Sequence, residues 1–303
     1  MRNPSSYFWW RVLFDFSWEV EESLCWYLDK VGIKTYAITI PPLDSSQRSL
    51  IIWLPSHEWS ESEINSLNNS LNDLTKPFFI SIQKGHLDKV EDEEWNHSWK
   101  KYWFPDQVGS KLMILPAWLD KPIDINNRFI LRIDPGCAFG TGSHPTTRLC
   151  LEILEKIDLK GFKVADVGCG SGILSLASLY FGADNTFAVD NDSLAIASAK
   201  QNANLNNSIS DRLHVFFGSV EILQGKVSSG KFDLILCNIL LNIIIELVPM
   251  IDNIVKPGGQ ALFSGILVNQ SSNIVSILEG IGWEILSLYS KDEWSLIHAR
   301  KII

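Results

Sequence analysis

The chain has 303 residues, of which 46% are hydrophobic, a combination that favours two folded domains and excludes a disordered chain. The formal net charge of −9 argues against a nucleic-acid-binding surface, and the five cysteines, scattered without a C-x-x-C pair, indicate reduced thiols and no metal site. No run approaches the roughly 18 apolar residues of a membrane span, and the N-terminus lacks a signal-peptide cleavage site, so we expect a cytoplasmic protein with no membrane segment.

The first 86 residues are predicted to form a small α+β domain with the order βαββαβ, which is ferredoxin-like. Two helices are indicated by capping patterns at Ser17 and at Ser60 with Glu63. The domain has no catalytic constellation and lacks the basic and aromatic pattern of an RNA-recognition module, so we interpret it as a protein-binding or positioning domain. Aromatic or alternating apolar residues predict its strands over 7–16, 34–40, 50–54 and 78–83.

Residues 87–106 are predicted to form a linker helix with an acidic start. Trp95, Trp99 and Trp103 recur at every fourth position within it, so they share one face of a helix. Such a stripe favours packing against the surface of a domain. The alternative is a hinge helix that carries the first domain, with its cargo, towards a second domain over residues 107–303.

Two predicted strands, over 111–115 and 128–133, lead into the stretch D-P-G-C-A-F-G-T-G-S-H-P-T-T-R at 134–148. Its glycine and threonine content excludes the interior of a helix or strand, and a helix is predicted to begin near Pro145. Loops of specialised composition are where ligand contacts concentrate. His144 is the histidine best placed for chemistry, although a structural hydrogen bond fits it better.

The sequence V-A-D-V-G-C-G-S-G at 164–172 predicts a buried strand followed by a glycine turn, and the next residues predict a helix. In that arrangement backbone N–H groups and the N-terminus of the helix face a ligand. The third glycine, Gly172, follows Gly168 by four positions, whereas a dinucleotide fingerprint requires five. The spacing therefore argues against NAD.

Two acids complete the pattern around Gly168 and Gly170. Asp166 precedes the glycines, and Asp190 closes the next predicted strand, 22 residues after Gly168. A carboxylate at that distance can accept hydrogen bonds from both ribose hydroxyls of an adenosine. The motif D-x-G-x-G-x-G with the second acid resembles the S-adenosylmethionine (SAM) site of class I methyltransferases and predicts SAM as the cofactor.

The remaining elements predict an α/β fold with a Rossmann-like, seven-stranded class I methyltransferase sheet. A strand over 232–237 delivers Asn238 to its carboxyl end, the edge of an open α/β sheet where ligands bind. Asn238 is therefore placed to face the transferable methyl; its alternative role is the N-cap of the following helix. The other elements are a helix over 193–206 and strands over 213–217, 261–266, 283–289 and 294–300.

Five segments carry a family resemblance: A-F-G-T-G-S-H-P-T-T, D-V-G-C-G-S-G, A-V-D-N-D, C-N-I-L and S-G-I, at 138–147, 166–172, 188–192, 237–240 and 264–266. The first is the most specific, because generic methyltransferases lack it. Over nearly its full length the chain resembles the bacterial ribosomal protein L11 methyltransferase family. The departures are Ser143, where Thr or His is usual, and Leu241-Asn242, which replace a small Ala-Gly pair and could narrow the channel for an incoming amine.

The resemblance implies a first domain that captures the large-subunit ribosomal protein and a hinge that presents several amines in turn. We expect an uncharged amine, from a lysine side chain or the N-terminus, to attack the sulfonium methyl while the Asn238 side-chain oxygen aims it. We also expect a monomer. SAM contacts are implied at Thr147, Gly168, Asp190 and Asn238, with Phe139 and Thr141 in the loop beside them, and Gly170 belongs to the same predicted site.

Three other functions share part of this pattern. A SAM-dependent lysine methyltransferase acting on another protein would have the same cofactor motifs. An adenine or ribosomal RNA methyltransferase is disfavoured because N-I-L-L after the fourth strand offers no aromatic side chain to stack a base. A non-enzymatic SAM-binding scaffold is disfavoured by the intact Asp190, Asn238 and glycine turn.

Overall fold

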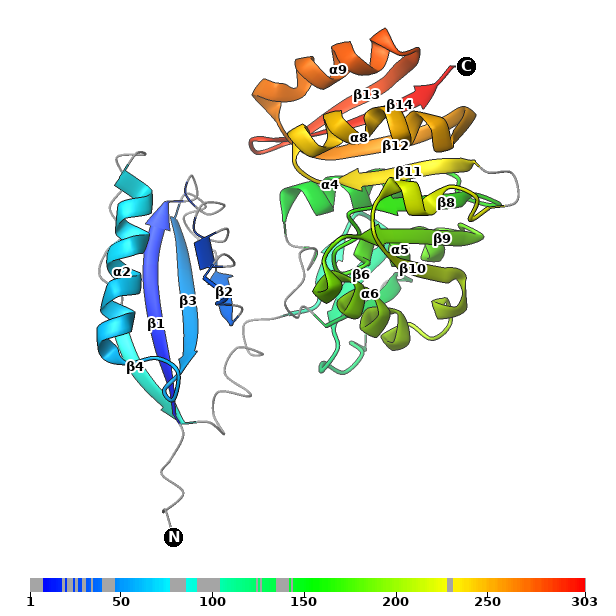
Figure 1. Ribbon diagram of the computed structural model, residues 1–303. Helices are drawn as coiled ribbons and strands as arrows, with labels where there is room; N and C mark the ends of the chain where they lie inside the picture. Colours follow the sequence, from blue (N-terminus) through cyan, green and yellow to red (C-terminus); the bar gives the residue numbers. More distant parts are fainter. Residues whose placement is uncertain are drawn as a thin grey trace. The chain divides into compact units, whose positions relative to one another are not determined.

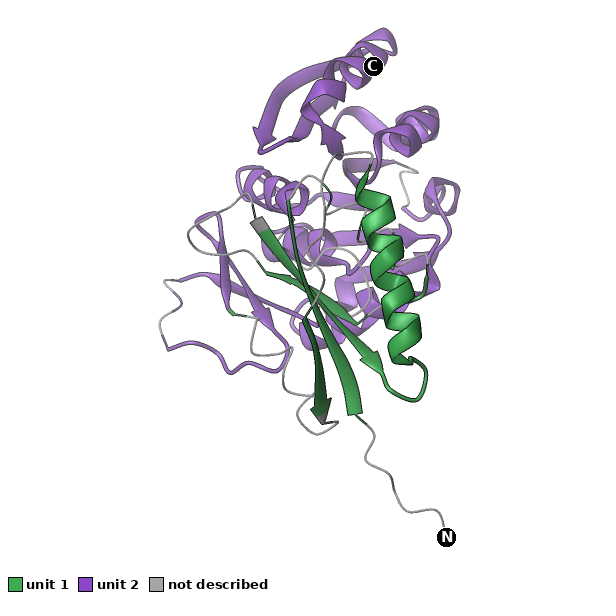
Figure 2. Cartoon of the chain, turned by 90° about the vertical axis from the view of Figure 1, so that its left-hand side faces the viewer, with its two compact units in different colours: residues 1–104 green, residues 105–303 purple. Residues whose placement is uncertain are grey.

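The chain divides into two compact units, residues 1–104 and residues 105–303, which are coloured separately in Figure 2. The computed structural model describes residues 8–17, 20, 24, 27–28, 31–33, 35–39, 47–76, 86–91, 104–123, 125, 127–134, 142, 144–227 and 231–302.

The first unit contains an antiparallel four-stranded sheet with the order β2-β3-β1-β4, covered by helix α2. Helical residues also occur between β1 and β2, at Leu24, Tyr27 and Leu28. This strand order and the helix after β3 confirm the predicted ferredoxin-like arrangement. The elements are β1 (Phe8–Ser17), β2 (Tyr36–Thr39), β3 (Gln47–Pro55), α2 (Glu61–Thr75) and β4 (His86–Glu91), labelled in Figure 1.

Local sequence explains most of this unit. Strand β1 alternates, so that Trp10, Val12, Phe14 and Phe16 are buried against α2 and β3 while the residues between them are half-buried or exposed. Helix α2 begins with the predicted capping box. The Ser60 hydroxyl accepts from the Glu63 N–H at 3.3 Å, and the Glu63 carboxylate accepts from the Ser60 N–H at 2.8 Å.

The predicted linker helix over 87–106 is wrong at both of its ends. Residues 87–91 belong to β4, which pairs with β1 from Leu13–His86 to Phe8–Glu91, and Asp106 already begins the second unit's first strand. Backbone pairing along the free edge of β1 satisfies a whole row of N–H and C=O groups, which outweighs the helix-like charge pattern. The first unit therefore extends past residue 86. The strand predicted over 78–83 and the tryptophans at 95, 99 and 103 lie outside the described residues.

The second unit is built on a seven-stranded sheet with the order β10-β9-β8-β11-β12-β14-β13 (Figure 1). Neighbours from β10 to β12 are parallel, and β14 is antiparallel to both β12 and β13. The strand order reverses between β8 and β11, because β9 and β10 lie on one side of β8 and β11 lies on the other. Open α/β sheets bind ligands at such a topological switch point. The strands are β8 (Lys163–Val167), β9 (Asn185–Asp190), β10 (Leu213–Phe217), β11 (Phe232–Asn238), β12 (Val255–Leu267), β13 (Trp283–Lys291) and β14 (Trp294–Lys301).

Two apolar clusters cover the two faces of this sheet. One gathers α4, α5 and α6 with a small sheet of β5, β6 and β7, and the other gathers α7, α8 and α9. No helix among the described residues is long and apolar enough to cross a membrane. The elements are β5 (Asp106–Val108), β6 (Leu112–Pro116), β7 (Phe129–Ile133), α4 (Pro145–Leu154), α5 (Ile173–Tyr180), α6 (Ser193–Leu205), α7 (Val220–Leu223), α8 (Leu241–Ile254) and α9 (Ser271–Gly280).

Candidate cofactor site

The turn between β8 and α5 requires glycine at three positions. Gly168, Gly170 and Gly172 have φ angles of +73°, +53° and +78°, which side chains of L-residues rarely adopt. A Cβ on Gly168 would lie 2.4 Å from Cγ2 of Ile239, in the turn after β11. The glycines therefore supply the backbone conformation of the turn and the space that lets a neighbouring turn approach it.

Asp190, at the end of β9, holds this glycine turn in place. Its Oδ2 accepts from the Gly170 N–H at 2.9 Å, and its Oδ1 accepts from the Asp192 N–H at 2.9 Å. The side chain is half-buried at the carboxyl edge of the sheet. Because a carboxylate has about four acceptor positions, Asp190 can hold the turn and still accept hydrogen bonds from a diol such as a ribose.

Asp166, the other predicted acid, lies underneath the turn, with only 1% of its surface exposed. Its Oδ2 accepts from the Ser175 hydroxyl at 2.6 Å, which ties β8 to the first turn of α5. Burial raises the pKa of this carboxyl to about 7. Asp166 therefore supports the turn from below. Burial also raises the pKa of the Cys169 thiol, so this cysteine within the turn is unreactive.

Asn238, at the end of β11, meets Thr147 of α4 across 91 residues of sequence. The Asn238 Nδ2 donates to the Thr147 hydroxyl at 3.4 Å. The Asn238 Oδ1 is buried and has no hydrogen-bond partner within the described residues. Leu240, not Asn238, occupies the N-cap position of α8, so the alternative capping role of Asn238 is wrong. An unpaired buried acceptor at a ligand-binding edge indicates a hydrogen-bond donor in the bound molecule.

The S-G-I segment in β12 fixes the turn that follows Asn238. Gly265 has a φ of +82° at a register irregularity between Ser264 and Ile266. A Cβ at this position would lie 2.3 Å from the backbone oxygen of Ile239. Gly265 on one side and Gly168 on the other thus enclose Ile239, and this packing sets the position of the neighbouring Asn238 side chain.

The described parts of the 134–148 stretch lie against the same site. Gly142 packs between Ile114 of β6 and Ile173, the first residue of α5: a Cβ at Gly142 would lie 2.2 Å from the Ile114 Cδ1 and 3.2 Å from the Ile173 Cδ1. His144 caps α4, with its Nδ1 2.8 Å from the Thr146 hydroxyl and its ring 5.2 Å from that of Trp294. Burial lowers the pKa of His144 to about 4, so the ring is neutral at physiological pH. The structural role predicted for His144 is confirmed. Phe139, Thr141 and Ser143 lie outside the described residues.

Sequence and structural comparisons converge on one family. A profile of ribosomal protein L11 methyltransferases (PrmA) matches residues 8–302. The chain belongs to this family. The chain is 43% identical over 297 residues to a ribosomal protein L11 methyltransferase of Prochlorococcus marinus, covering 98% of each chain. It is 46% identical over 283 residues to that of Parasynechococcus marenigrum, covering 93% of this chain and 98% of the relative.

A solved ribosomal protein L11 methylase from Lactobacillus delbrueckii subsp. bulgaricus is similar in fold. It superposes with a TM-score of 0.59 at 34% identity and covers 66% of this chain and all of its own. As a ribosomal protein L11 methyltransferase family member, the protein is a methyltransferase that uses SAM. The residues at the site fit this cofactor: the glycine turn, the half-buried Asp190 carboxylate and the unpaired Asn238 Oδ1 offer acceptors and close backbone approach.

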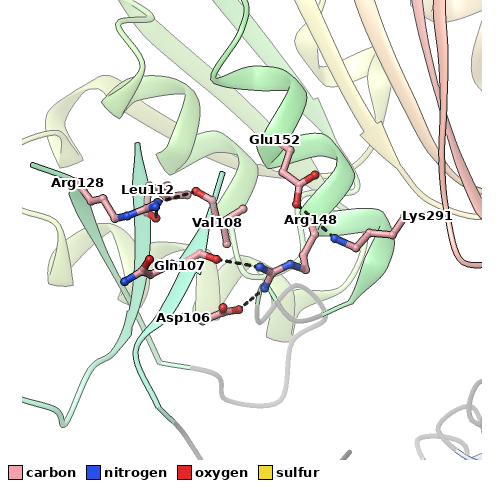
Figure 3. A network of polar contacts seen from close by, with 8 residues as sticks. All are labelled: Asp106, Gln107, Val108, Leu112, Arg128, Arg148, Glu152 and Lys291. Atoms are coloured by element: carbon pink, nitrogen blue, oxygen red, sulfur yellow. Dashed lines mark hydrogen bonds and ion pairs between the residues drawn. The ribbon is translucent and has the colours of Figure 1, made fainter. Parts of the chain in front are cut away.

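In this methyltransferase, α4 is anchored on both sides by charged contacts that the sequence did not reveal (Figure 3). Arg148 pairs with Asp106 and donates to the Gln107 carbonyl at 2.9 Å. One turn further, Glu152 accepts from Lys291 of β13 at 3.3 Å. Because Thr147 directly precedes Arg148 in this helix, these contacts fix the position at which Thr147 meets Asn238. Charged residues on a predicted helix are usually exposed to solvent. Only the structure, which shows the partners of Arg148 and Glu152, identifies these two as anchoring residues.

The Leu241-Asn242 pair, which departs from the family pattern, lies in the first turn of α8. Leu241 is half-buried and packs on the apolar cluster of α7, α8 and α9. Asn242 is exposed. Leu240 and Ile243 beside them are apolar residues that expose 61% and 38% of their surfaces. The predicted narrowing of an amine channel stays a prediction.

Proposed function

We propose that the protein transfers methyl groups from SAM to amino groups of ribosomal protein L11, namely lysine side chains and the N-terminal amine. Family membership supports the substrate. The observation that carries the choice of an amine is the buried Asn238 Oδ1 at the carboxyl end of β11, which has no hydrogen-bond partner among the residues that the structure describes. An amide oxygen accepts hydrogen bonds and therefore suits a nucleophile that bears N–H groups.

The proposed cofactor site joins the glycine turn, Asp190 and the Asn238–Thr147 pair. SAM would supply a methyl group on a positively charged sulfur: a neutral amine would form a bond to the methyl carbon as the carbon–sulfur bond breaks and S-adenosylhomocysteine leaves. We assign the binding of its ribose to Asp190 and close backbone contact to Gly168 and Gly170. The assignment extends to Thr147 and Asn238 and, from the family resemblance, to Phe139 and Thr141.

The role of Asn238 is to orient the amine. A lysine amine must be neutral to attack, and an apolar surrounding disfavours its charged form and lowers its pKa. We assign this role to the exposed apolar side chains of Leu240 and Ile243, two and five residues after Asn238. The Asn238 Oδ1 then accepts one N–H of the neutral amine and directs its lone pair at the methyl carbon. The proton released after transfer passes to water.

The wider biological context follows from this substrate. We propose that the first unit binds the ribosomal protein, that the enzyme acts as a monomer in the cytoplasm, and that it contacts no nucleic acid directly. The net charge of −9 supports attraction to a basic ribosomal protein over attraction to RNA.

The test compares purified large-subunit ribosomal proteins by intact mass before and after incubation with the enzyme and SAM. We expect L11 to gain mass in whole methyl groups, with peptide mapping locating them on lysines or the N-terminus. Methylation of a different protein alone would refute the substrate, and methyl groups on other residue types would refute the amine.

Asn238→Ala tests the mechanism, with Asn253→Ala as the matched control because Asn253 is an exposed asparagine near the far end of α8. We expect Asn238→Ala to bind S-adenosylhomocysteine (SAH) and to lose about a hundredfold in kcat. We expect Asn253→Ala to keep full activity. Undiminished turnover in Asn238→Ala would remove this residue from the mechanism.

A further inference from the structure

Two buried asparagines lie four residues apart at the end of helix α6: Asn202 within the helix and Asn206 at its C-cap, with 0% and 3% of their surfaces exposed. Helix interiors rarely bury asparagine, because each amide brings donors and an acceptor that need partners. Both side chains face the end of β7. The hydrogen-bond partners of Asn202 and Asn206 show which segment each side chain holds in place.

Asn206 bonds the end of β7 and not the glycine turn. Its Oδ1 accepts from the Arg132 N–H at 3.0 Å, and its Nδ2 donates to the Arg132 carbonyl at 2.7 Å. The amide thus pairs with the strand as a neighbouring strand would. A second donor, the Tyr180 hydroxyl, lies 3.2 Å from the same Oδ1. None of these groups belongs to the glycine turn.

Asn202 connects two different segments. Its Oδ1 accepts from the Asp134 N–H at 2.8 Å, and its Nδ2 donates to the Ser171 carbonyl, inside the glycine turn, at 2.9 Å. The preceding residue, Gln201, also holds Asp134, because it donates to the Asp134 carboxylate at 2.8 Å. On the same face of α6, Ala199 lies 3.1 Å from the position of a Cβ on Gly172. Helix α6 therefore contacts the turn at two neighbouring points.

Asp134 is the first residue of the stretch 134–148, which carries the most specific family motif. Within this stretch, Gly142 packs on Ile114 of β6 and on Ile173, the residue that follows the glycine turn. The Asn202 amide ties the first residue of the stretch, Asp134, to the glycine turn. We infer that Asn202 is a positioning residue for SAM binding, which holds Asp134 and the glycine turn in one fixed relation.

This inference rests on the proposed cofactor contacts of the glycine turn and adds a residue that touches no ligand. In Asn202→Leu, the Ser171 carbonyl and the Asp134 N–H lose their amide partner, while the side chain keeps a branch at Cγ and a residue type that favours helix. We expect its Kd for SAH, measured by calorimetry on the full chain, to rise by about tenfold or more.

The matched control is Asn206→Leu, the same substitution four residues further on, at the C-cap of the same helix. We expect both variants to lower the Tm of the ligand-free protein, but only Asn202→Leu to weaken SAH. If Asn202→Leu does not fold, Asn202→Asp serves instead, since it keeps the acceptor for Asp134 and replaces the donor that faces Ser171. Equal SAH affinity in an Asn202 variant and in Asn206→Leu would overturn the inference.

Asp190→Ala separates this result from a failure of the proposed function. Weak SAH binding in Asp190→Ala with wild-type binding in the Asn202 variants would refute the inference alone. Wild-type binding in Asp190→Ala would refute the proposed cofactor site, whatever Asn202 does.

Discussion

Replacing Gly265 by alanine tests whether the turn after Asn238 is fixed by backbone contact. Gly265 has a φ of +82°, and a Cβ there would lie 2.3, 2.8 and 3.1 Å from the O, C and N atoms of Ile239. All three are backbone atoms, so no side-chain rotation relieves the overlap. Either β12 or the turn that carries Asn238 must move.

Two contributions set the magnitude. The left-handed backbone conformation costs a residue with a Cβ about 1–2 kcal/mol, and insertion of a methyl group into closely packed surroundings costs about 1–3 kcal/mol more. Gly265→Ala should therefore lower the free energy of unfolding by about 2–5 kcal/mol. Gly282→Ala is the matched control: its φ is +87°, and nothing lies within 4 Å of its Cβ position. Gly282→Ala should lower the free energy of unfolding only by the cost of the left-handed backbone conformation.

The assay is urea unfolding of both variants and the wild type, together with calorimetric SAH binding. We expect Gly265→Ala to be the less stable variant and also to bind SAH more weakly, because Asn238 adjoins the displaced Ile239. Gly282→Ala should bind SAH as the wild type does. Equal stability losses in the two variants, or undisturbed SAH binding in Gly265→Ala, would refute the argument that Gly265 positions Asn238.

Two further predictions concern pH. Burial raises the pKa of Asp166 from 3.8 to about 7, so the folded state favours the protonated form, and a contribution of about 4 kcal/mol is lost as the pH rises through that range; urea unfolding at several pH values should show this loss in the wild type and not in Asp166→Asn. Burial lowers the pKa of His144 from 6.5 to about 4, so a contribution of about 3 kcal/mol is present above pH 6.5 and is lost as the pH falls towards 4. His144→Asn, which can still cap α4, should remove that acid sensitivity in Tm measurements; an unchanged pH profile in either variant would contradict the corresponding prediction.

Sequence patterns predicted the site best where chemistry is local. Strand 213–217 has the predicted bounds, and Asp190 and Asn238 both end strands at the carboxyl edge. Strand residues that are buried on both faces form continuous apolar runs, and turns that require a positive φ require glycine, so both are visible in a single sequence. The sequence of β4, H-L-D-K-V-E, has no such pattern. Its strand conformation depends on pairing with β1, more than 70 residues earlier.

Sequence patterns also failed to identify the role of polar residues whose hydrogen-bond partners are distant in sequence. Asn202 and Asn206 look like surface positions of a helix, and only the position of β7 makes them buried and paired. Asp166 was grouped with the cofactor acids because it precedes the glycines, but it lies beneath them and bonds Ser175. A motif gives the residue types that a site contains. Which of them face the ligand is decided by the tertiary structure.

The position of β14 has a consequence for how this protein is made. β14 is the last strand of its sheet to leave the ribosome, yet it lies between β12 and β13. Until residues 294–301 are synthesised, β12 keeps an open edge and His144 lacks the Trp294 ring beside it. Every described residue of the cofactor site is translated earlier than this. The enzyme should therefore acquire its capacity to bind SAM late and in one step, when the nascent chain closes the gap in its own sheet.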